Sequence, residues 1–191
     1  MTNQRWPILL HQADITLAPL RLRDKGAWDR VRSSNREWLT PWEATLPRIS
    51  GEKVANKLPT YLSMVLAHNK EGRAGRTISL AIWYQGAMVG QISMGGIIYG
   101  ALRGAHIGYW IDSAYANRGI VTSAVEMLTQ YGFEQLHLHR IEINLRPEND
   151  ASRRVAEKSG YQLEGERPRF LHIDGQWRDH LCFVRENPNI L

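Results

Sequence analysis

The chain has 191 residues, a length typical of one domain with a substantial buried core. Its content of 43% apolar and 9% aromatic residues excludes an intrinsically disordered protein. The formal charge of +5 favours an anionic partner such as a phosphate-rich cofactor, whereas the dispersed basic residues do not indicate direct binding of nucleic acid.

Hydrophobic periodicity and turn residues predict mixed helices and strands in the first half of the chain. Asp24 lies where it would cap the first helix, whose inner face would carry Ala27, Trp28 and Val31. The expected elements are a strand at 15–22, a helix at 24–34, an aromatic loop at 39–43, a helical segment at 51–71 interrupted at Pro59, and a hairpin of strands at 77–84 and 87–98 around Gln85–Gly86.

The second half of the chain is predicted to contain further strands of the same sheet, together with two more helices. They are a strand at 106–111, a helix after the turn at 116–121, a strand at 140–146, a helix at 150–159, and two strands that meet at Asp174–Gly175. The strand at 140–146 has an apolar face of Ile141, Ile143 and Leu145 and a polar face of Glu142, Asn144 and Arg146. Strands that precede, separate and follow the helices predict an α+β fold.

Several classes of site are disfavoured by the sequence. Cys182 is the single cysteine and lies in an apolar segment typical of a buried strand, so we expect neither a disulfide nor a catalytic thiol. His137 and His139 have metal-like spacing without an evident third ligand, so no metal is expected. Because residues 8–12 do not form a signal sequence and no apolar run approaches ~20 residues, we expect a cytoplasmic protein that does not enter a membrane.

The turn Ala-Asn-Arg-Gly-Ile-Val at 116–121 leads from a predicted strand directly into a strongly periodic helix. The unpaired N–H groups and the dipole of a helix N-terminus attract phosphate, and Gly119 would let a ligand approach the backbone. The helix would be fixed against the sheet by an apolar stripe of Val121, Val125, Leu128 and Gly132. The turn is neither a Walker loop nor a dinucleotide fingerprint, and many such turns bind nothing, so the anion site is one of two interpretations.

A second polar group opens the helix at 150–159. Asn149 and Ser152 are three positions apart across the helix start, so both side chains could face one ligand. The alternative is a plain helix cap by Asn149 or Asp150, with Ser152 solvated.

These two groups, in this order, resemble the GNAT superfamily of acetyl-CoA-dependent N-acetyltransferases over residues 15–186, with an N-terminal extension at 1–14 and a tail at 187–191. The similarity narrows to the RimJ/RimL branch, which acetylates N-terminal α-amines of ribosomal proteins. It is carried by Pro-Trp-Glu at 41–43, Gly-Tyr-Trp at 108–110, Arg-Pro-Glu-Asn-x-x-Ser at 146–152 and Ile-Asp-Gly-Gln-Trp-Arg-Asp-His at 173–180. The resemblance implies a mixed, mostly antiparallel sheet that is splayed at the acetyl-CoA site and has helices on both faces.

The resemblance also implies which residues bind the coenzyme. The backbone of Tyr109, Trp110 and Ile111 would pair with the pantetheine arm, and Asn149 would contact it. The pyrophosphate would be held by the N–H groups of Asn117, Arg118, Gly119, Ile120, Val121 and Thr122. Ala116 and Val121 depart from the family motif, which has Arg or Gln first and Gly or Ala last. Neither departure excludes binding, since the backbone makes the contacts.

The implied reaction is direct attack of a free amine on the thioester, with the two reactants held side by side. Many members of the family use a tyrosine as the acid at the position of Ala156, so Ser152 is the expected proton donor here. Asn144 occupies the place of a frequent catalytic Glu and cannot act as a base. Glu142, on the same strand face, is the expected base, directly or through water; its alternative is a solvated charge.

The acceptor site would include Trp42 and Glu43, because an acidic wall suits a cationic N-terminus, although Trp42 could equally belong to the core. His106 and Asn144 could line the same site, and a packed or surface histidine is the alternative for His106. We expect a protein N-terminus as partner, with a ribosomal protein as the candidate; a monomer and a homodimer both stay open. The alternatives are acylation of a small amine or antibiotic, or a non-enzymatic acyl-CoA-binding or RNA-associated module.

Overall fold

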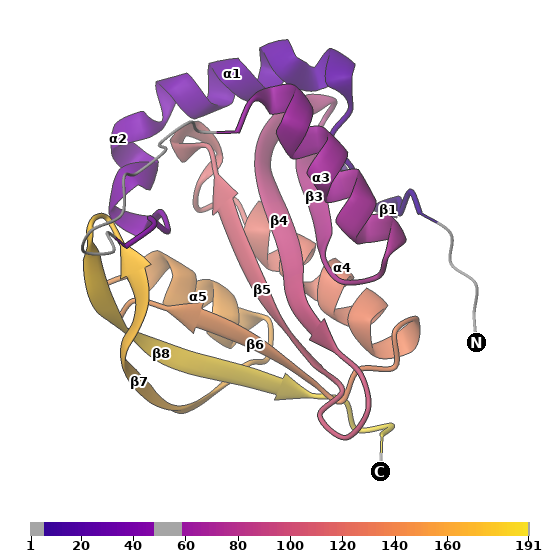
Figure 1. The fold of residues 1–191 in the computed structure, drawn as a ribbon, viewed down its shortest axis with the longest axis vertical. Helices are drawn as coiled ribbons and strands as arrows, with labels where there is room; N and C mark the ends of the chain where they lie inside the picture. The colour runs from indigo at the N-terminus through magenta and orange to yellow at the C-terminus, as the bar shows by residue number, and fades with distance from the viewer. Residues whose placement is uncertain (1–5, 48–58, 191) are drawn as a thin grey trace.

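The computed structural model describes residues 6–47 and 59–190, which form one mixed sheet with helices on both faces (Figure 1). The strands are β1 (Leu10–Gln12), β2 (Ile15–Ala18), β3 (Ile78–Tyr84), β4 (Ala87–Ile98), β5 (Gly104–Ile111), β6 (Arg140–Leu145), β7 (Gln162–Ile173) and β8 (Gln176–Glu186). The helices are α1 (Lys25–Ser34), α2 (Arg36–Leu39), α3 (Tyr61–Arg73), α4 (Ile120–Glu134) and α5 (Asp150–Lys158), with 3-10 turns η1 (Leu22–Asp24), η2 (Thr40–Trp42) and η3 (Ser113–Tyr115). The predicted α+β fold is confirmed.

The sheet has the strand order β1-β2-β3-β4-β5-β6-β8-β7, in which β5 and β6 are parallel and the other neighbours antiparallel. The parallel pairing ends after Gly104–His106 meets Arg140–Glu142, although β5 continues to Ile111 and β6 to Leu145. Figure 1 shows the two strands diverging beyond this point. The predicted splay is therefore present, and it leaves one backbone edge of β5 without a strand partner.

Separate apolar clusters cover the two faces of the sheet. The apolar side of α4 packs with β3–β6 in the larger cluster, which includes Val125 and Leu128, both fully buried. Gly132 allows this close packing, since a Cβ there would lie 2.7 Å from the Cδ1 atom of Ile141. On the other face, a smaller cluster joins α1 and α3 to the sheet through Val65 and Ala81. In Figure 1, α3 lies in front of the sheet and α4 behind it.

Both predicted hairpins are confirmed, and their turns explain why. Gln85 and Gly86 have φ angles of 50° and 81°, and Asp174 and Gly175 have 45° and 76°. Two consecutive left-handed residues form the hairpin turn whose twist matches that of the flanking strands.

The N-terminal third differs from expectation. β1 was not predicted, and β2 ends at Ala18, four residues before the predicted end of the first strand. The predicted aromatic loop at 39–43 is instead helical through η2, since Pro41 lies in a first turn, where its missing N–H is not needed. Asp24 accepts a hydrogen bond from the backbone N–H of Arg21, so its side chain caps η1 rather than α1.

The helical segment predicted at 51–71 is present in the structure as α3, which begins at Tyr61 after a Thr60 cap. The part of the prediction at 51–58 lies outside the described residues. Within residues 6–47 and 59–190, the helices are too short or too polar to span a bilayer.

Candidate active site

The site is centred on the loop that connects the end of β5 to the start of α4. Asn117 and Gly119 adopt left-handed φ angles of 60° and 76°, so the chain turns sharply into the helix. Space around Gly119 is open, because a Cβ there would meet nothing within 4 Å. Ser123 donates the first helical N–H bond, to the carbonyl of Gly119 at 3.0 Å. By helix geometry the N–H groups of 120–122 therefore lack acceptors within the helix and carry its positive dipole end.

The start of α5 lies opposite this loop. The Oδ1 atom of Asn149 accepts a hydrogen bond from the backbone N–H of Ser152 at 3.0 Å, so the helix-cap interpretation of Asn149 is correct. Its amide NH₂ group remains available as a donor. The Oγ atom of Ser152 lies 2.7 Å from the phenol oxygen of Tyr109 on β5, which is a direct contact between the two elements.

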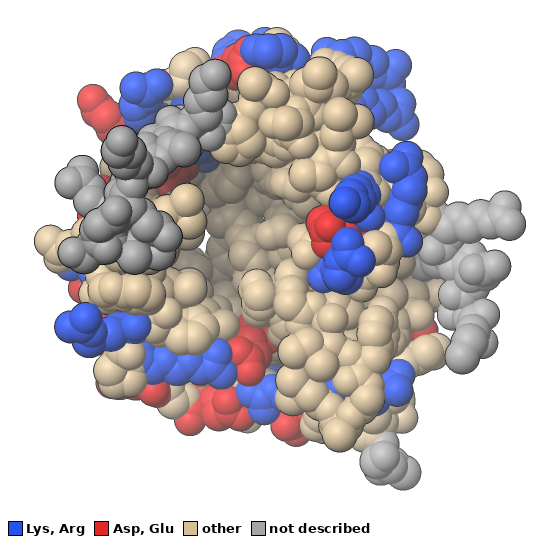
Figure 2. Space-filling view, in the orientation of Figure 1, with Lys and Arg blue, Asp and Glu red and all other residues tan. Residues whose placement is uncertain are grey.

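A cavity of about 770 Å³ lies between these elements and the α2–η2 segment. The space-filling view in Figure 2 is hollowed at its centre, between the N-terminal helices and the β7–β8 hairpin. The predicted residues that line the cavity are Trp42, Tyr109, Trp110, Ile111, Asn117, Arg118, Gly119, Ile120, Val121, Thr122, Asn149 and Ser152. The structure thus brings all the predicted coenzyme-binding residues together with Trp42.

The junction between α1 and α2 is hydrogen-bonded to the end of β5. The sequence analysis did not predict this contact. The indole Nε1–H of Trp38 donates to the carbonyl of Ile111 at 3.1 Å, and the buried Asn35 accepts from the N–H of Ser113 at 2.9 Å. Trp38 also lines the cavity. Its position one helical turn before Trp42 is the signal that could have revealed it.

The cavity is suited to a phosphate-bearing ligand. Besides the N-terminus of α4, it is lined by Arg118, Arg154 and Lys158. The guanidinium of Arg118 lies 5.0 Å from the ring centre of Tyr115, a cation–π contact that orients it. Arg154 and Lys158 were not predicted, although their spacing of four residues places both on one face of α5. The lining also contains Glu126, Glu148 and Asp150, so the feature that favours phosphate is the group of backbone donors at the start of α4, with Arg118 beside it.

Of the two acceptor residues predicted at 42–43, Trp42 lines the cavity and Glu43 does not. Trp42 is 37% exposed and lies 5.4 Å below the guanidinium of Arg146, so it lines the cavity and does not belong to the core. Glu43 forms an ion pair with Arg32, whose guanidinium also lies 5.2 Å from the ring of Trp110. The carboxylate of Glu43 is therefore already neutralised.

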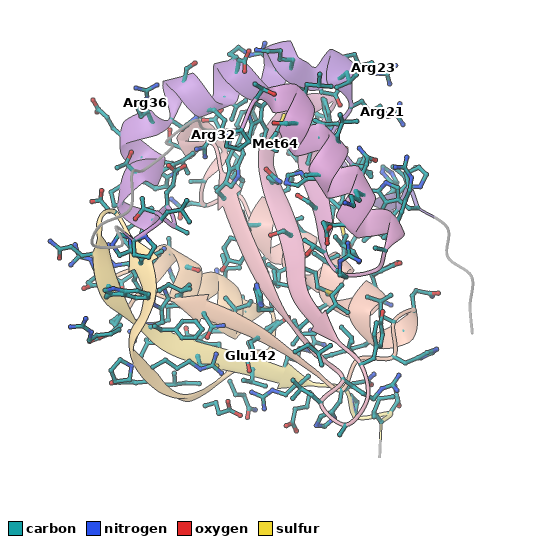
Figure 3. The ribbon with its side chains drawn as sticks, viewed as in Figure 1. Arg21, Arg23, Arg32, Arg36, Met64 and Glu142 are labelled. Carbon is teal, nitrogen blue, oxygen red and sulfur yellow. The ribbon has the colours of Figure 1, made fainter. Side chains whose placement is uncertain are left out.

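Glu142 does not line the cavity but lies nearer the narrow end of the splay, on the strand face opposite its buried neighbours (Figure 3). Its carboxylate accepts hydrogen bonds from Arg140 at 2.9 Å and Arg167 at 2.8 Å, and the amide of Asn144 lies at 3.4 Å. Burial alone would raise its pKa, but these hydrogen bonds, with that of Arg167 the strongest, lower the pKa of Glu142 to about 2. A carboxylate with this pKa is a very weak base, so the network argues against the predicted role of Glu142 in proton removal.

His106 and Asn144 also lie outside the cavity. Asn144 is held between Glu142 and Arg167, with its Oδ1 atom 3.3 Å from the latter. The imidazole of His106 packs over two glycines of β4, since a Cβ on Gly95 would lie 3.0 Å from its Nε2 atom. Burial lowers the pKa of His106, while Glu142 acts in the opposite direction. The side chain as a whole is nevertheless exposed on β5, so His106 is a surface histidine whose ring rests on these two glycines.

Cys182 is buried on β8, and burial raises the pKa of its thiol to about 11, so it is inert at neutral pH. The thiol and the carboxylates of Glu142 and Glu164 lie close together in the described part of the chain. Arg140 bridges both carboxylates, at 2.9 Å and 2.8 Å, and thereby supplies the positive charge that a metal would provide.

A splayed sheet that opens beside a helix N-terminus, with cations and a hydroxyl in one cavity, is the arrangement that the resemblance to coenzyme A-dependent acyltransferases implied. Residues 14–162 match the family model described as acetyltransferase (GNAT) domain, and the chain belongs to this family. Within it, the chain is RimJ/RimL-like.

Its fold matches the structure of Mycobacterium smegmatis RimJ in complex with CoA-disulfide, with 35% identity and a TM-score of 0.85, over 97% of this chain and 90% of that one. The [ribosomal protein uS5]-alanine N-acetyltransferase of Escherichia coli is 26% identical over 170 residues, which is 88% of this chain and 86% of that protein. The probable N-acetyltransferase YjcK of Bacillus subtilis is 42% identical over 102 residues, 53% of this chain, so the chain spans only 56% of that relative. Acetyl-CoA is the co-substrate that this family and the cavity indicate.

Proposed function

We propose that this protein acetylates the N-terminal α-amine of a cytoplasmic protein, with a ribosomal protein as the favoured acceptor. A ribosomal acceptor is supported by the name of one relative, the uS5-alanine N-acetyltransferase, which is 26% identical to this chain. The observation that carries the choice of amine is the place of Glu142, which lies outside the cavity and is paired with Arg140 and Arg167, so this carboxylate is not available as a base for a strongly basic amine.

The residues of the cavity have distinct tasks in this reaction. Acetyl-CoA supplies the activated acetyl group. The N–H groups at the start of α4, together with Arg118, bind phosphate, and the unpaired edge of β5 beyond His106 offers backbone donors and acceptors to an extended chain. Ser152 lies in the same cavity and donates a proton to the departing sulfur, which avoids release of a free thiolate.

The acceptor must reach this site largely deprotonated. An α-amine has a pKa near ~8, so roughly a quarter to a third of it is neutral at pH 7.5. A lysine side chain at ~10.4 is neutral to only about one part in a thousand, a deficit of roughly 4 kcal/mol. Without a competent base, a site of this kind accepts α-amines and rejects lysine side chains.

The proposal is tested by CoA release from acetyl-CoA with a panel of acceptors: peptides that match ribosomal-protein N-termini, N-terminally blocked lysine peptides, and small amines such as polyamines. We expect turnover with the free N-termini and little with the other two groups. Preferred turnover of small amines would contradict the proposed acceptor class, and binding of acetyl-CoA without any turnover would favour a binding module.

A further inference from the structure

The phenol of Tyr109 makes its closest polar contact with the residue that we assign as the acid. Its oxygen lies 2.7 Å from the Oγ atom of Ser152 and 3.3 Å from the backbone carbonyl oxygen of the same residue. Tyr109 reaches this position from β5, whereas Ser152 is in the first turn of α5, so the contact crosses the cavity floor between two elements. The ring is partly buried and packs against the main core cluster.

The two hydroxyls carry one proton each, and only one arrangement lets Ser152 act as an acid. If Ser152 donated to Tyr109, its proton would be engaged and could not reach a sulfur atom in the cavity. If Tyr109 donates to Ser152, the serine hydroxyl is free to point into the cavity. The 2.7 Å contact allows either direction, and the carbonyl at 3.3 Å is a much poorer acceptor for the phenol.

We propose that Tyr109 is a positioning residue that donates its hydrogen bond to Ser152. It thereby orients the serine hydroxyl toward the departing sulfur and, once that proton has been transferred, supplies a new proton to the serine oxygen. This inference rests on the proposed function, in which Ser152 is the acid. The phenol suits the task because, even with the pKa of Tyr109 raised to about 12 by burial, it is a stronger acid than an aliphatic hydroxyl, so the transient charge is a phenolate rather than a serine alkoxide.

Two protons move when the thioester is cleaved, one from serine to sulfur and one from the phenol to serine. As the C–S bond breaks, its electron pair stays on sulfur, the serine O–H proton moves to sulfur, and the phenol O–H proton moves to the serine oxygen. The amine nitrogen has formed the C–N bond and releases one proton to solvent, and the phenolate takes one proton from solvent. The products are the amide and the free thiol, with both hydroxyls restored.

The surroundings of Tyr109 keep it protonated between turnovers. Burial raises the pKa of Tyr109 to about 12, and the hydrogen bond with Ser152 offsets part of this effect. The phenol is therefore a donor throughout the physiological range, which is the state that the proposed arrangement requires.

The chain contains a matched control for this pair. Thr129 and Tyr161 also join their hydroxyls across two elements, at 2.6 Å, and both are buried in the core rather than in the cavity lining. Removing the phenol of Tyr161 tests what the loss of a buried tyrosine hydrogen bond does to stability alone.

The experiment compares kcat and KM for Tyr109→Phe, Ser152→Ala, the double variant and Tyr161→Phe, with thermal melts for each. We expect Ser152→Ala to lower kcat by about 10²-fold or more and Tyr109→Phe by about tenfold, both with little change in the KM for acetyl-CoA. Because the two residues act in series, the double variant should be no slower than Ser152→Ala alone. Tyr161→Phe should melt earlier but keep its kcat.

A single-turnover proton inventory, run on the wild type and on Tyr109→Phe, gives a readout that is independent of the steady-state constants. Two protons in flight should make the rate curve with the deuterium fraction of the solvent, and Tyr109→Phe should make the dependence linear. A kcat for Tyr109→Phe within twofold of wild type, multiplicative losses in the double variant, or a linear wild-type inventory would each overturn the inference while leaving the acetyltransferase intact. Full turnover by Ser152→Ala would remove the acid and this inference with it, and absence of CoA release by the wild type would remove the proposed function itself.

Discussion

Replacing Glu142 by Gln tests whether this carboxylate is a base or a structural anion. Its side chain is 18% exposed and bridges Arg140 on its own strand and Arg167 on β7. The lowering of its pKa from 4.5 to about 2 corresponds to about 3 kcal/mol of stabilisation, which is an upper bound for the loss in the variant. In a chain of this size, that corresponds to a decrease in Tm of up to about 10 °C.

The stability lost in Glu142→Gln should be largest at neutral pH and smallest in acid. A carboxylate whose pKa is lowered by folding stabilises the protein fully above its unfolded pKa, here 4.5, and the stabilisation disappears as the pH falls toward about 2. Urea denaturation of wild type and Glu142→Gln should therefore differ most near neutral pH and converge in acid. Glu164→Gln is the matched control, because Glu164 pairs with the same Arg140 but is 48% exposed, so we expect a loss below about 1 kcal/mol.

The pH dependence of kcat/KM distinguishes a catalytic from a structural role of Glu142. Between pH 6.5 and 8.5 a structural Glu142 is fully ionised, so the ratio of kcat/KM between wild type and Glu142→Gln should be constant over that range. A ratio that is larger at pH 6.5 than at pH 8.5, where the acceptor amine deprotonates itself, would restore Glu142 as the base and refute the assignment.

Further predictions concern the cavity. Gly119→Ala should weaken acetyl-CoA binding in calorimetry by about tenfold or more because a Cβ would stand where the ligand approaches, whereas Gly86→Ala, with a φ of 81° in the β3–β4 hairpin outside the cavity lining, should leave affinity unchanged. Trp38→Phe removes the hydrogen bond to the carbonyl of Ile111 and should raise the KM for acetyl-CoA by a few-fold; an unchanged KM would show that the contact does not hold β5 in place. Trp42→Ala should raise the KM of the acceptor peptide by roughly two- to tenfold, and an unaffected KM in steady-state kinetics would exclude Trp42 from the acceptor site.

The sheet could be predicted largely from local signals in the sequence, whereas the residues expected to bind the coenzyme were assigned through the resemblance to the GNAT family. Alternation on β6, the apolar stripe of α4 and the two-residue turns at Gly86 and Gly175 each depend on neighbouring residues only. Gly119 predicted the sharp turn and the open backbone at the start of α4, again from neighbouring residues only. Asp24 was predicted to cap the first helix, but its carboxylate instead accepts from the backbone N–H of Arg21, a competing donor that periodicity does not reveal.

The ionic and aromatic partners could not be predicted, because they join residues that are distant in sequence. Glu142 looked like a free carboxylate, yet Arg167, 25 positions away, holds it. Glu43 is neutralised by Arg32 from another helix. Tyr109 and Ser152 are 43 positions apart, and only the crossing of β5 toward α5 brings their oxygens together. Contacts of this kind depend on the assembled fold.

The most direct test of the account uses one peptide that carries both a free N-terminus and an internal lysine. After incubation with the wild-type protein and acetyl-CoA at pH 7.5, tandem mass spectrometry locates the acetyl group. The account predicts acetylation at the α-amine with the lysine side chain essentially unmodified, because the cavity has the donors for acetyl-CoA, whereas the expected base, Glu142, lies outside it and is paired with two arginines. Acetylation at the lysine in preference to the α-amine would contradict it.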